Sequence, residues 1–131
     1  MKLNKQFVQE LFKNLETGQQ DRFFDHVSPN VLWQVMGTHP LAGIYHSKQE
    51  FFDHTFALLN KVLKHGPTLE VNNIIIAAEE PIAIVEMHQL SATLDDKPFN
   101  NYYCWIVKFE GDLIVEVKAY LDSTLVKQLF S

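Results

Sequence analysis

The second half of the chain constrains the fold most, because it holds four long strand-like segments joined by very short turns. These segments lie at about residues 68–78, 82–94, 99–109 and 113–122. Turns this short join only antiparallel neighbours, since a parallel crossover needs about a dozen residues. The sequence therefore predicts an antiparallel sheet whose long strands must twist and bend.

The first half of the chain has helical periodicity instead. Apolar Leu3, Phe7, Leu11 and Leu15 recur every four residues, which predicts one buried helix face that ends near Gly18. A later helix begins with a capping box over residues 47–50, in which a serine and a glutamate satisfy the first amides. The predicted apolar face of this helix consists of Phe52, Phe56, Leu59 and Leu63. The remaining predicted elements are a helical segment over residues 23–27, a strand over residues 31–36 and a final helix capped by Asp122 or Ser123.

Helices first and long strands later is the order of a segregated α+β protein. A length of 131 residues suits one domain with one hydrophobic core. We therefore expect a single domain over residues 1–131, with a cone-shaped, strongly curved antiparallel sheet covered by the N-terminal helices. The aromatic content of 12% is compatible with an interior lined by rings.

Charge and hydropathy argue against two large classes of partner. The chain has 11 basic against 16 acidic residues and no basic run, whereas a nucleic-acid binder needs clustered cations. Its longest strongly apolar run, residues 74–78, is far too short to span a membrane. The N-terminal residues do not resemble a signal peptide, and the lone Cys104 excludes an internal disulfide. We expect a cytoplasmic protein without a nucleic-acid or membrane partner.

Two stretches carry a resemblance to a known family. One is residues 33–45, WQVMGTHPLAGIY, followed by the capped helix, and the other is residues 114–122, IVEVKAYLD, a last strand ending in aromatic-x-Asp. Together with the element order, these stretches resemble the nuclear transport factor 2-like superfamily, which includes ketosteroid isomerase, limonene-epoxide hydrolase and the SnoaL-like polyketide cyclases. The resemblance implies a pocket inside the cone, usually in a homodimer, that acts on small hydrophobic or polyketide-like molecules.

The register that the resemblance suggests assigns alternate strand residues to the pocket. A one-residue error would turn each set to the opposite face. The predicted pocket residues are Trp33 and Val35 on the first strand, Glu86 and His88 on the third, Tyr102 and Cys104 on the fourth, and Val117 and Ala119 on the last, with His39, Tyr45, Phe52 and Phe56 from loops and helices.

Glu86 and His88 are the candidate catalytic residues. They interrupt an apolar strand at positions i and i+2, so both side chains share one face. Burial would raise the pKa of the carboxyl and lower that of the imidazole, which would bring both near neutrality. The alternative is that this Glu-x-His pair points outward into water.

Other positions depart from the enzymes that the chain resembles. Gln34 is nearest to the general-base aspartate of ketosteroid isomerase, and Ala119 stands where the SnoaL-like cyclases and epoxide hydrolases place a catalytic aspartate. Leu11 falls near the isomerase's first-helix tyrosine. None of the established mechanisms therefore transfers intact. No metal-ligand spacing and no phosphate-binding loop is present, so we expect neither metal nor cofactor.

The same register turns large aromatic residues outward. Tyr103, Trp105 and Tyr120 then lie on an open sheet face, which predicts a homodimer through that face. Three interpretations of function follow. The first is a SnoaL-like pocket protein that binds a small, largely apolar molecule and performs isomerase-, cyclase- or hydrolase-type acid–base chemistry. The second is a non-catalytic dimeric binding or interaction module, and the third is a purely structural dimer with a filled interior.

Overall fold

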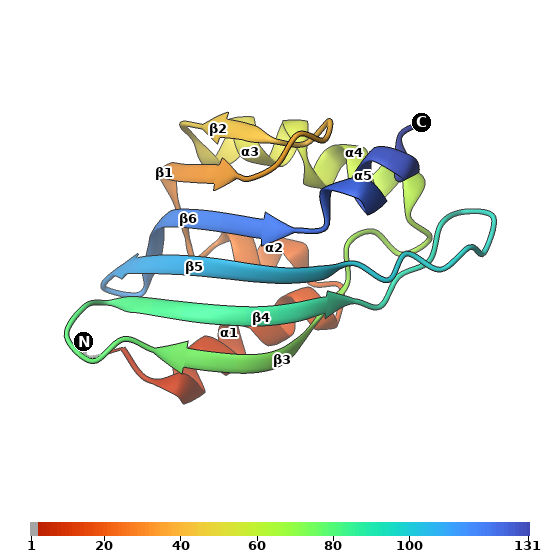
Figure 1. The fold of residues 1–131 in the computed structure, drawn as a ribbon. Coiled ribbons are helices and arrows are strands. Elements are labelled where there is room, and N and C mark those ends of the chain that lie inside the picture. Colours follow the sequence, from red (N-terminus) through yellow and green to blue (C-terminus); the bar gives the residue numbers. More distant parts are fainter. Residues whose placement is uncertain (1–2) are drawn as a thin grey trace.

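Six strands form one curved sheet in the order β2-β1-β6-β5-β4-β3, and the sheet does not close into a barrel (Figure 1). The computed structural model describes residues 3–131. The strands are β1 (Val27–Val35), β2 (Gly43–Tyr45), β3 (Leu69–Ile76), β4 (Ile82–Gln89), β5 (Tyr102–Glu110) and β6 (Leu113–Leu121).

The predicted α+β class, with a curved sheet covered by N-terminal helices, is confirmed. One part of the pairing differs, because β1 runs parallel to β6 while the other neighbours are antiparallel. The short-turn argument applies only to strands that follow each other directly in the chain. β1 is separated from β6 by most of the sequence, so that argument never constrained its direction.

Two helices cover one face of the sheet, α1 (Lys5–Glu16) and α2 (Gln20–Phe24), and both lie behind it in Figure 1. The side chain of Asn4 caps α1 by accepting a hydrogen bond from the Phe7 amide at 2.9 Å. The buried residues of α1 are Val8, Leu11, Phe12 and Leu15, whereas the predicted Leu3 and Phe7 are only partly buried.

The predicted third helix is two short helices, α3 (Lys48–His54) and α4 (Phe56–Val62). Its cap is as expected, because the Glu50 amide donates to Ser47 Oγ at 3.0 Å. The break falls at Thr55, whose hydroxyl donates to the Phe51 carbonyl at 2.7 Å. The buried aromatic residue of α3 is accordingly Phe51 rather than the predicted Phe52.

The C-terminal helix α5 (Ser123–Leu129) is capped by Asp122, which accepts hydrogen bonds from the Thr124 and Leu125 amides. Asn101 holds this cap to the sheet. Its buried amide accepts from the Asp122 N–H at 3.0 Å and donates to the Asp122 carbonyl at 3.3 Å. The end of β6 is therefore fixed next to the start of β5.

The connection between β4 and β5 is longer than the predicted four-residue turn. Residues 90–101 form an arm that extends beyond the sheet in Figure 1. Isolated bridges join Ala92 to Pro98 within the arm and Leu63 to Thr93 at its base.

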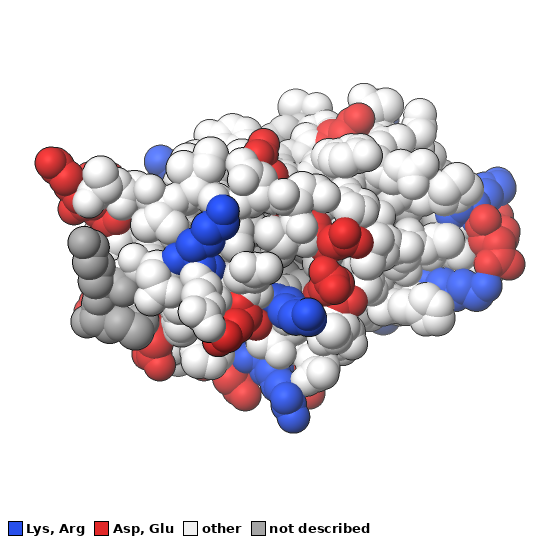
Figure 2. Space-filling model, turned by 90° about the horizontal axis from the view of Figure 1, so that it is seen from below, with Lys and Arg blue, Asp and Glu red and all other residues white. Residues whose placement is uncertain are grey.

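The second face of the sheet has no helix over it in the part of the chain that the structure describes, and it faces the viewer in Figure 1. We call it the outer face, and the helix-covered side the inner face. Figure 2, seen from below, shows acidic and basic side chains interspersed rather than gathered by sign. Within residues 3–131, no helix has the length and apolar composition that crossing a membrane requires.

Candidate functional site

A narrow cavity lies between the inner face of the sheet and helices α3, α4 and α5. The volume of this cavity is about 50 Å³. Its lining residues are Trp33, Val35, His39, Leu41, Phe51, Thr55, Phe56, Leu59, Pro67, Leu69, Phe99, Tyr103, Trp105, Ala119, Leu121 and Val126.

Aromatic rings build the deepest wall of this cavity. Trp33 stacks on Phe51 with ring centroids 3.8 Å apart and meets Trp105 edge to face at 5.2 Å. Neighbouring β6 contributes Leu121 and the methyl group of Ala119, which pairs with both Val35 and Trp105 in the sheet. A small residue at this central position leaves the room that larger side chains would fill.

His39 lies at the cavity wall with both ring nitrogens bonded to backbone. The Leu41 amide donates to Nδ1 at 3.1 Å, so the proton is on Nε2, which donates to the Met36 carbonyl at 2.9 Å. Burial lowers the pKa of this imidazole, and the bond to Met36 opposes that shift in part. His39 is thus a neutral imidazole that fixes its own loop and has no nitrogen free to move a substrate proton.

Tyr103 brings a hydroxyl to the same cavity. Gln89 Nε2 donates to the Tyr103 oxygen at 3.2 Å, while Gln89 Oε1 accepts from the Thr68 amide at 2.6 Å. The amide orientation follows from these partners, and it leaves the Tyr103 O–H free to donate elsewhere. Burial raises the pKa of Tyr103, with the Gln89 hydrogen bond opposing the shift, so the phenol stays protonated at neutral pH.

The electrostatic character of the cavity is neutral. Among residues 3–131, no Asp, Glu, Lys or Arg lines it, and His39 and Tyr103 are its titratable groups. In the same part of the chain, no three side chains of the metal-ligating types come together. The cavity can therefore bind apolar surface and exclude water, but among residues 3–131 it offers no carboxylate base.

Of the residues predicted for the pocket, Trp33, Val35, His39, Phe56 and Ala119 line the cavity. The three others on its side of the sheet and helices are packed nearby without lining it: Val117 is fully buried in the core, Tyr45 donates its hydroxyl proton to the Leu41 carbonyl at 2.8 Å, and Phe52 packs edge to face on Phe24.

The prediction that Glu86 and His88 face the pocket is wrong. Both lie on the outer face, where Glu86 accepts a hydrogen bond from Asn73 at 3.1 Å. His88 Nδ1 bonds to Asn72 at 3.0 Å, and its Nε2 lies 3.8 Å from Glu70. The inner positions of β4 are the alternate, fully apolar set from Ala83 to Met87, followed by Gln89.

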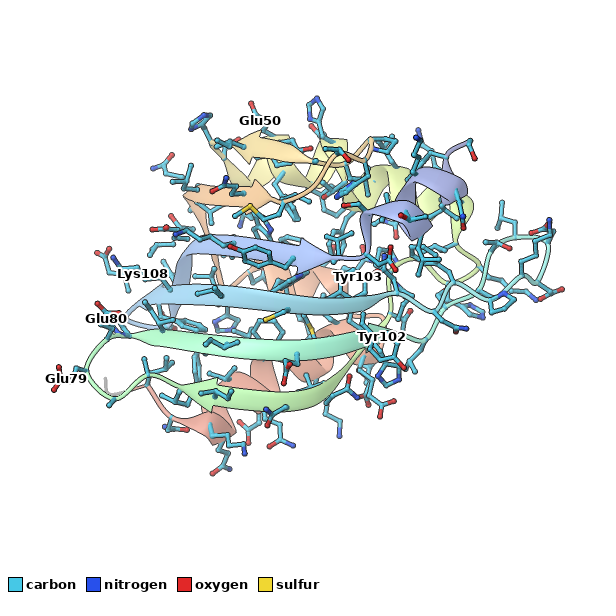
Figure 3. All side chains as sticks on the ribbon, in the orientation of Figure 1. Glu50, Glu79, Glu80, Tyr102, Tyr103 and Lys108 are labelled. Carbon is cyan, nitrogen blue, oxygen red and sulfur yellow. The ribbon has the colours of Figure 1, made fainter. Side chains whose placement is uncertain are left out.

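The register of β5 is reversed in the same way. Tyr102 and Cys104 pair with His88 and Glu86 on the outer face, whereas Tyr103 and Trp105 turn inward to the cavity. The predicted outward placement of Tyr103 and Trp105 is therefore wrong as well. Cys104 is part-buried, and burial, with the nearby Glu86 charge, raises the pKa of its thiol. Figure 3 labels the neighbours Tyr102 and Tyr103 at the start of β5.

The structure shows where the positions lie at which this sequence differs from the enzymes that it resembles. Ala119 lines the cavity, so a carboxylate is missing at the very position where the resemblance implies one. Gln34 pairs with Lys118 and Ile44 in the sheet and does not line the cavity, while Leu11 is buried in the main core. No other described carboxylate takes over, because none lines the cavity between residues 3 and 131.

No family model matches the chain. It is 26% identical over 126 residues to the dimerizing cyclase phiC of a fungal species, covering 92% of this chain and 54% of that protein. It is also 26% identical over 102 residues to the dimerizing cyclase tstC of Talaromyces stipitatus, covering 76% and 45% respectively. The chain thus spans about half the length of the curated relatives it matches.

Solved structures with the same architecture cover nearly the whole chain. An NTF2-like protein from Burkholderia thailandensis has a TM-score of 0.77 at 19% identity, covering 96% of this chain and 95% of that one. A putative isomerase from Bacillus subtilis has 0.76 at 12%, covering 95% and 90%. TerC, co-crystallized with polyporic acid, has 0.75 at 13%, covering 95% of both chains. The fold is the nuclear transport factor 2-like fold, as the sequence resemblance implied.

Proposed function

We propose that this chain of nuclear transport factor 2-like fold binds a small, largely apolar molecule in its inner cavity and promotes cyclase- or isomerase-type chemistry there. The observation that carries the proposal is the cavity itself, which is walled by stacked aromatic rings and lacks charged side chains among the described residues. The relatives named dimerizing cyclases support the reaction class, and the polyporic acid complex of TerC shows that a similar fold was crystallised with an organic ligand.

Cyclase-type chemistry fits the cavity better than isomerase-type chemistry. Moving a proton along a carbon skeleton needs a free base. His39 is the imidazole at the cavity wall, and both of its ring nitrogens are hydrogen-bonded to backbone groups. Ring closure of an already reactive molecule depends instead on holding its reacting carbons together. A dry, shaped and apolar cavity supplies that orientation.

The lack of a free base at the cavity wall among residues 3–131 also favours the second interpretation, a binding module without turnover. The two are separated by incubating a bound unsaturated carbonyl compound with the protein and following it by mass spectrometry. Binding with conversion supports the cyclase proposal, whereas binding without conversion across a panel of such compounds supports the module.

Occupation of the cavity is tested with Ala119→Leu, which adds three carbons at its centre. The chain has two tryptophans, and both line the cavity, so two indole N–H signals report directly on a ligand there. We expect saturable shifts of both signals with methylenecyclohexane, and at least about a tenfold loss of affinity in the variant, since the leucine occupies the same space. Tyr120→Phe, one residue away on the outer face, is the matched control and should bind normally. No saturable shift in the unmodified protein would contradict the proposal.

We also propose that two copies associate through their outer faces. Tyr102 is 67% exposed, Tyr120 44% and Ile44 54%, although all three lie on strands of the sheet. Lys108 and Glu116 are paired positions on the same face, so two copies related by a two-fold axis can set opposite charges against each other around an apolar centre. This replaces the residues expected from the sequence, of which only Tyr120 lies on that face.

Sedimentation measures this association directly. Tyr120→Lys should convert a dimer to a monomer at micromolar concentration, because it places two lysines against each other across the axis. Leu94→Lys, at an exposed position of the arm, is the matched control and should leave the dimer intact. A monomeric unmodified protein at those concentrations would refute the dimer without bearing on the cavity.

A further inference from the structure

The cavity is smaller than the molecules that the proposed function requires. Its volume is about 50 Å³. An apolar protein cavity that takes up a benzene ring measures about 150 Å³. Protein interiors are close-packed, so the surrounding core offers no spare space to a ligand. A ring-sized molecule therefore enters only if one wall of the cavity moves outward.

The cavity lies at the boundary between two hydrophobic clusters. The larger cluster supplies the aromatic wall of Trp33, Phe51 and Trp105. The buried members of the smaller cluster are Leu41, Leu59, Leu63, Phe99 and Val126. All of these except Leu63 also line the cavity. Because the clusters are separate, the smaller one can shift without repacking the aromatic wall.

Hydrogen bonds hold several of the cavity walls to the body of the protein. Lys48 of α3 donates to the Phe24 carbonyl at 2.9 Å. The side-chain amides of Asn60 on α4 and Gln20 on α2 exchange hydrogen bonds at 3.0 and 3.2 Å. The loop after β1 is held by the two backbone partners of His39. These walls are therefore fixed in place.

Helix α5 is held only at its start. It follows β6 and packs beside α4 (Figure 1). Asn101 fixes the base of the arm by accepting from the Gln89 amide at 2.9 Å, and it binds both backbone groups of Asp122. Anywhere in residues 3–131, no hydrogen bond or ion pair joins residues 124–131 to a residue before Asp122. A seven-residue helix is not stable in isolation, so apolar packing alone keeps α5 in place.

We infer that α5 is the wall that opens to admit a ligand, and that Val126 is a specificity-determining residue that sets how large the bound molecule can be. Val126 is the buried residue of α5, with 2% of its surface exposed, and it lines the cavity. The ligand class is a neutral, apolar ring compound larger than the closed cavity. This inference rests on the proposed function, because it concerns the same cavity.

The position of α5 and the binding of a ligand are thermodynamically linked. Moving α5 outward separates Val126 from Leu59 and Phe99, and the free energy lost in that step opposes binding. A smaller side chain at position 126 lowers this cost and adds space next to the ligand. The gain in affinity should therefore grow with the size of the ligand.

The test compares two substitutions of a buried helical valine. Val126→Ala changes the cavity wall, whereas Val8→Ala is the matched control on α1, in the main core and away from the cavity. The probes are methylenecyclohexane and its bulkier tert-butyl derivative, with affinities read from the two indole N–H signals. The ratio of bulky-probe to small-probe affinity should rise about 3- to 10-fold in Val126→Ala. It should stay within about twofold in Val8→Ala.

Amide hydrogen exchange in the unmodified protein provides a second measurement, which decides the matter should Val126→Ala not fold. Saturation with the bulky probe should speed exchange at the amides of α5, because the ligand keeps the helix from its packed position, while the amides of α1 should not exchange faster. An unchanged affinity ratio in Val126→Ala, or slower exchange of α5 in the complex, overturns the movable wall and leaves the proposed cavity function standing. If methylenecyclohexane does not bind the unmodified protein, both are overturned.

Discussion

The two tyrosines that open β5 show how differently the two faces of one sheet are used. Tyr102 is 67% exposed on the outer face beside His88, whereas its neighbour Tyr103 lines the cavity and accepts a hydrogen bond from Gln89 (Figure 3). One peptide bond separates a residue suited to a protein interface from one suited to a ligand. In this fold, chemical function follows from strand register more than from residue type.

We expect the largest difference in stability between the two faces when a glutamate is introduced on one face or on the other. Val85 is fully buried on the inner face, and Ile84 is its part-buried neighbour on the outer face. Val85→Glu should lower the free energy of unfolding by about 4 kcal/mol or more, since an unpaired carboxylate would enter the core. Ile84→Glu should cost about 1 kcal/mol or less. Urea unfolding followed by circular dichroism measures both, and equal losses would mean that the faces are assigned incorrectly.

The sequence predicted the class of the fold well, because its evidence was local. The periodicity of α1, the serine cap of α3, the aspartate cap of α5 and the four long strands are each determined by residues within one or two turns. The parallel pairing of β1 with β6 was missed, since nothing local to either strand encodes it.

The candidate site was predicted less well, for a specific physical reason. Over residues 82–85 both faces of β4 are apolar, as are both faces of β5 from Tyr102 to Val107, so alternation alone does not identify the inner set. A signal was present in the charges. Glu86, Lys108 and Lys118 lie on three neighbouring strands, and all three belong to the alternate set of residues that faces outward. The other set of β5, which includes Tyr103 and Trp105, must then face inward.

A second, smaller contrast compares two adjacent asparagines. Asn101 is completely buried and holds both the N–H and the carbonyl of Asp122, while Asn100 is exposed. Asn101→Ala should lower the free energy of unfolding by about 3 kcal/mol, because it leaves two backbone groups at the start of α5 unpaired. Asn100→Ala should change it by less than about 0.5 kcal/mol. Similar values for both would show that the Asp122 groups find other partners.

The inner face should also add a pH dependence to stability. Burial lowers the pKa of His39 below its usual value of 6.5, so the unfolded chain binds the proton more readily than the folded one. This contribution is present above pH 6.5 and is lost as the pH falls through the lowered pKa. His39→Gln, which keeps a donor and an acceptor without titrating, should lose less stability than the unmodified protein between pH 7 and 5. Parallel pH curves would contradict the buried, neutral state of this imidazole.

The smallest expected effect concerns the pair that first suggested a site. His88 lies on the outer face between Asn72 and Glu70, and the sheet itself separates it from the cavity. His88→Ala should therefore leave the affinity for methylenecyclohexane within about twofold, since it changes neither the lining nor the volume of the cavity. The matched inner variant is Ala119→Leu, which should lower the same affinity at least about tenfold. If the outer histidine mattered for binding and the inner alanine did not, β4 would have to be turned by one residue, and the candidate site would return to the Glu-x-His pair. One substitution on each face thus tests the strand register through ligand binding.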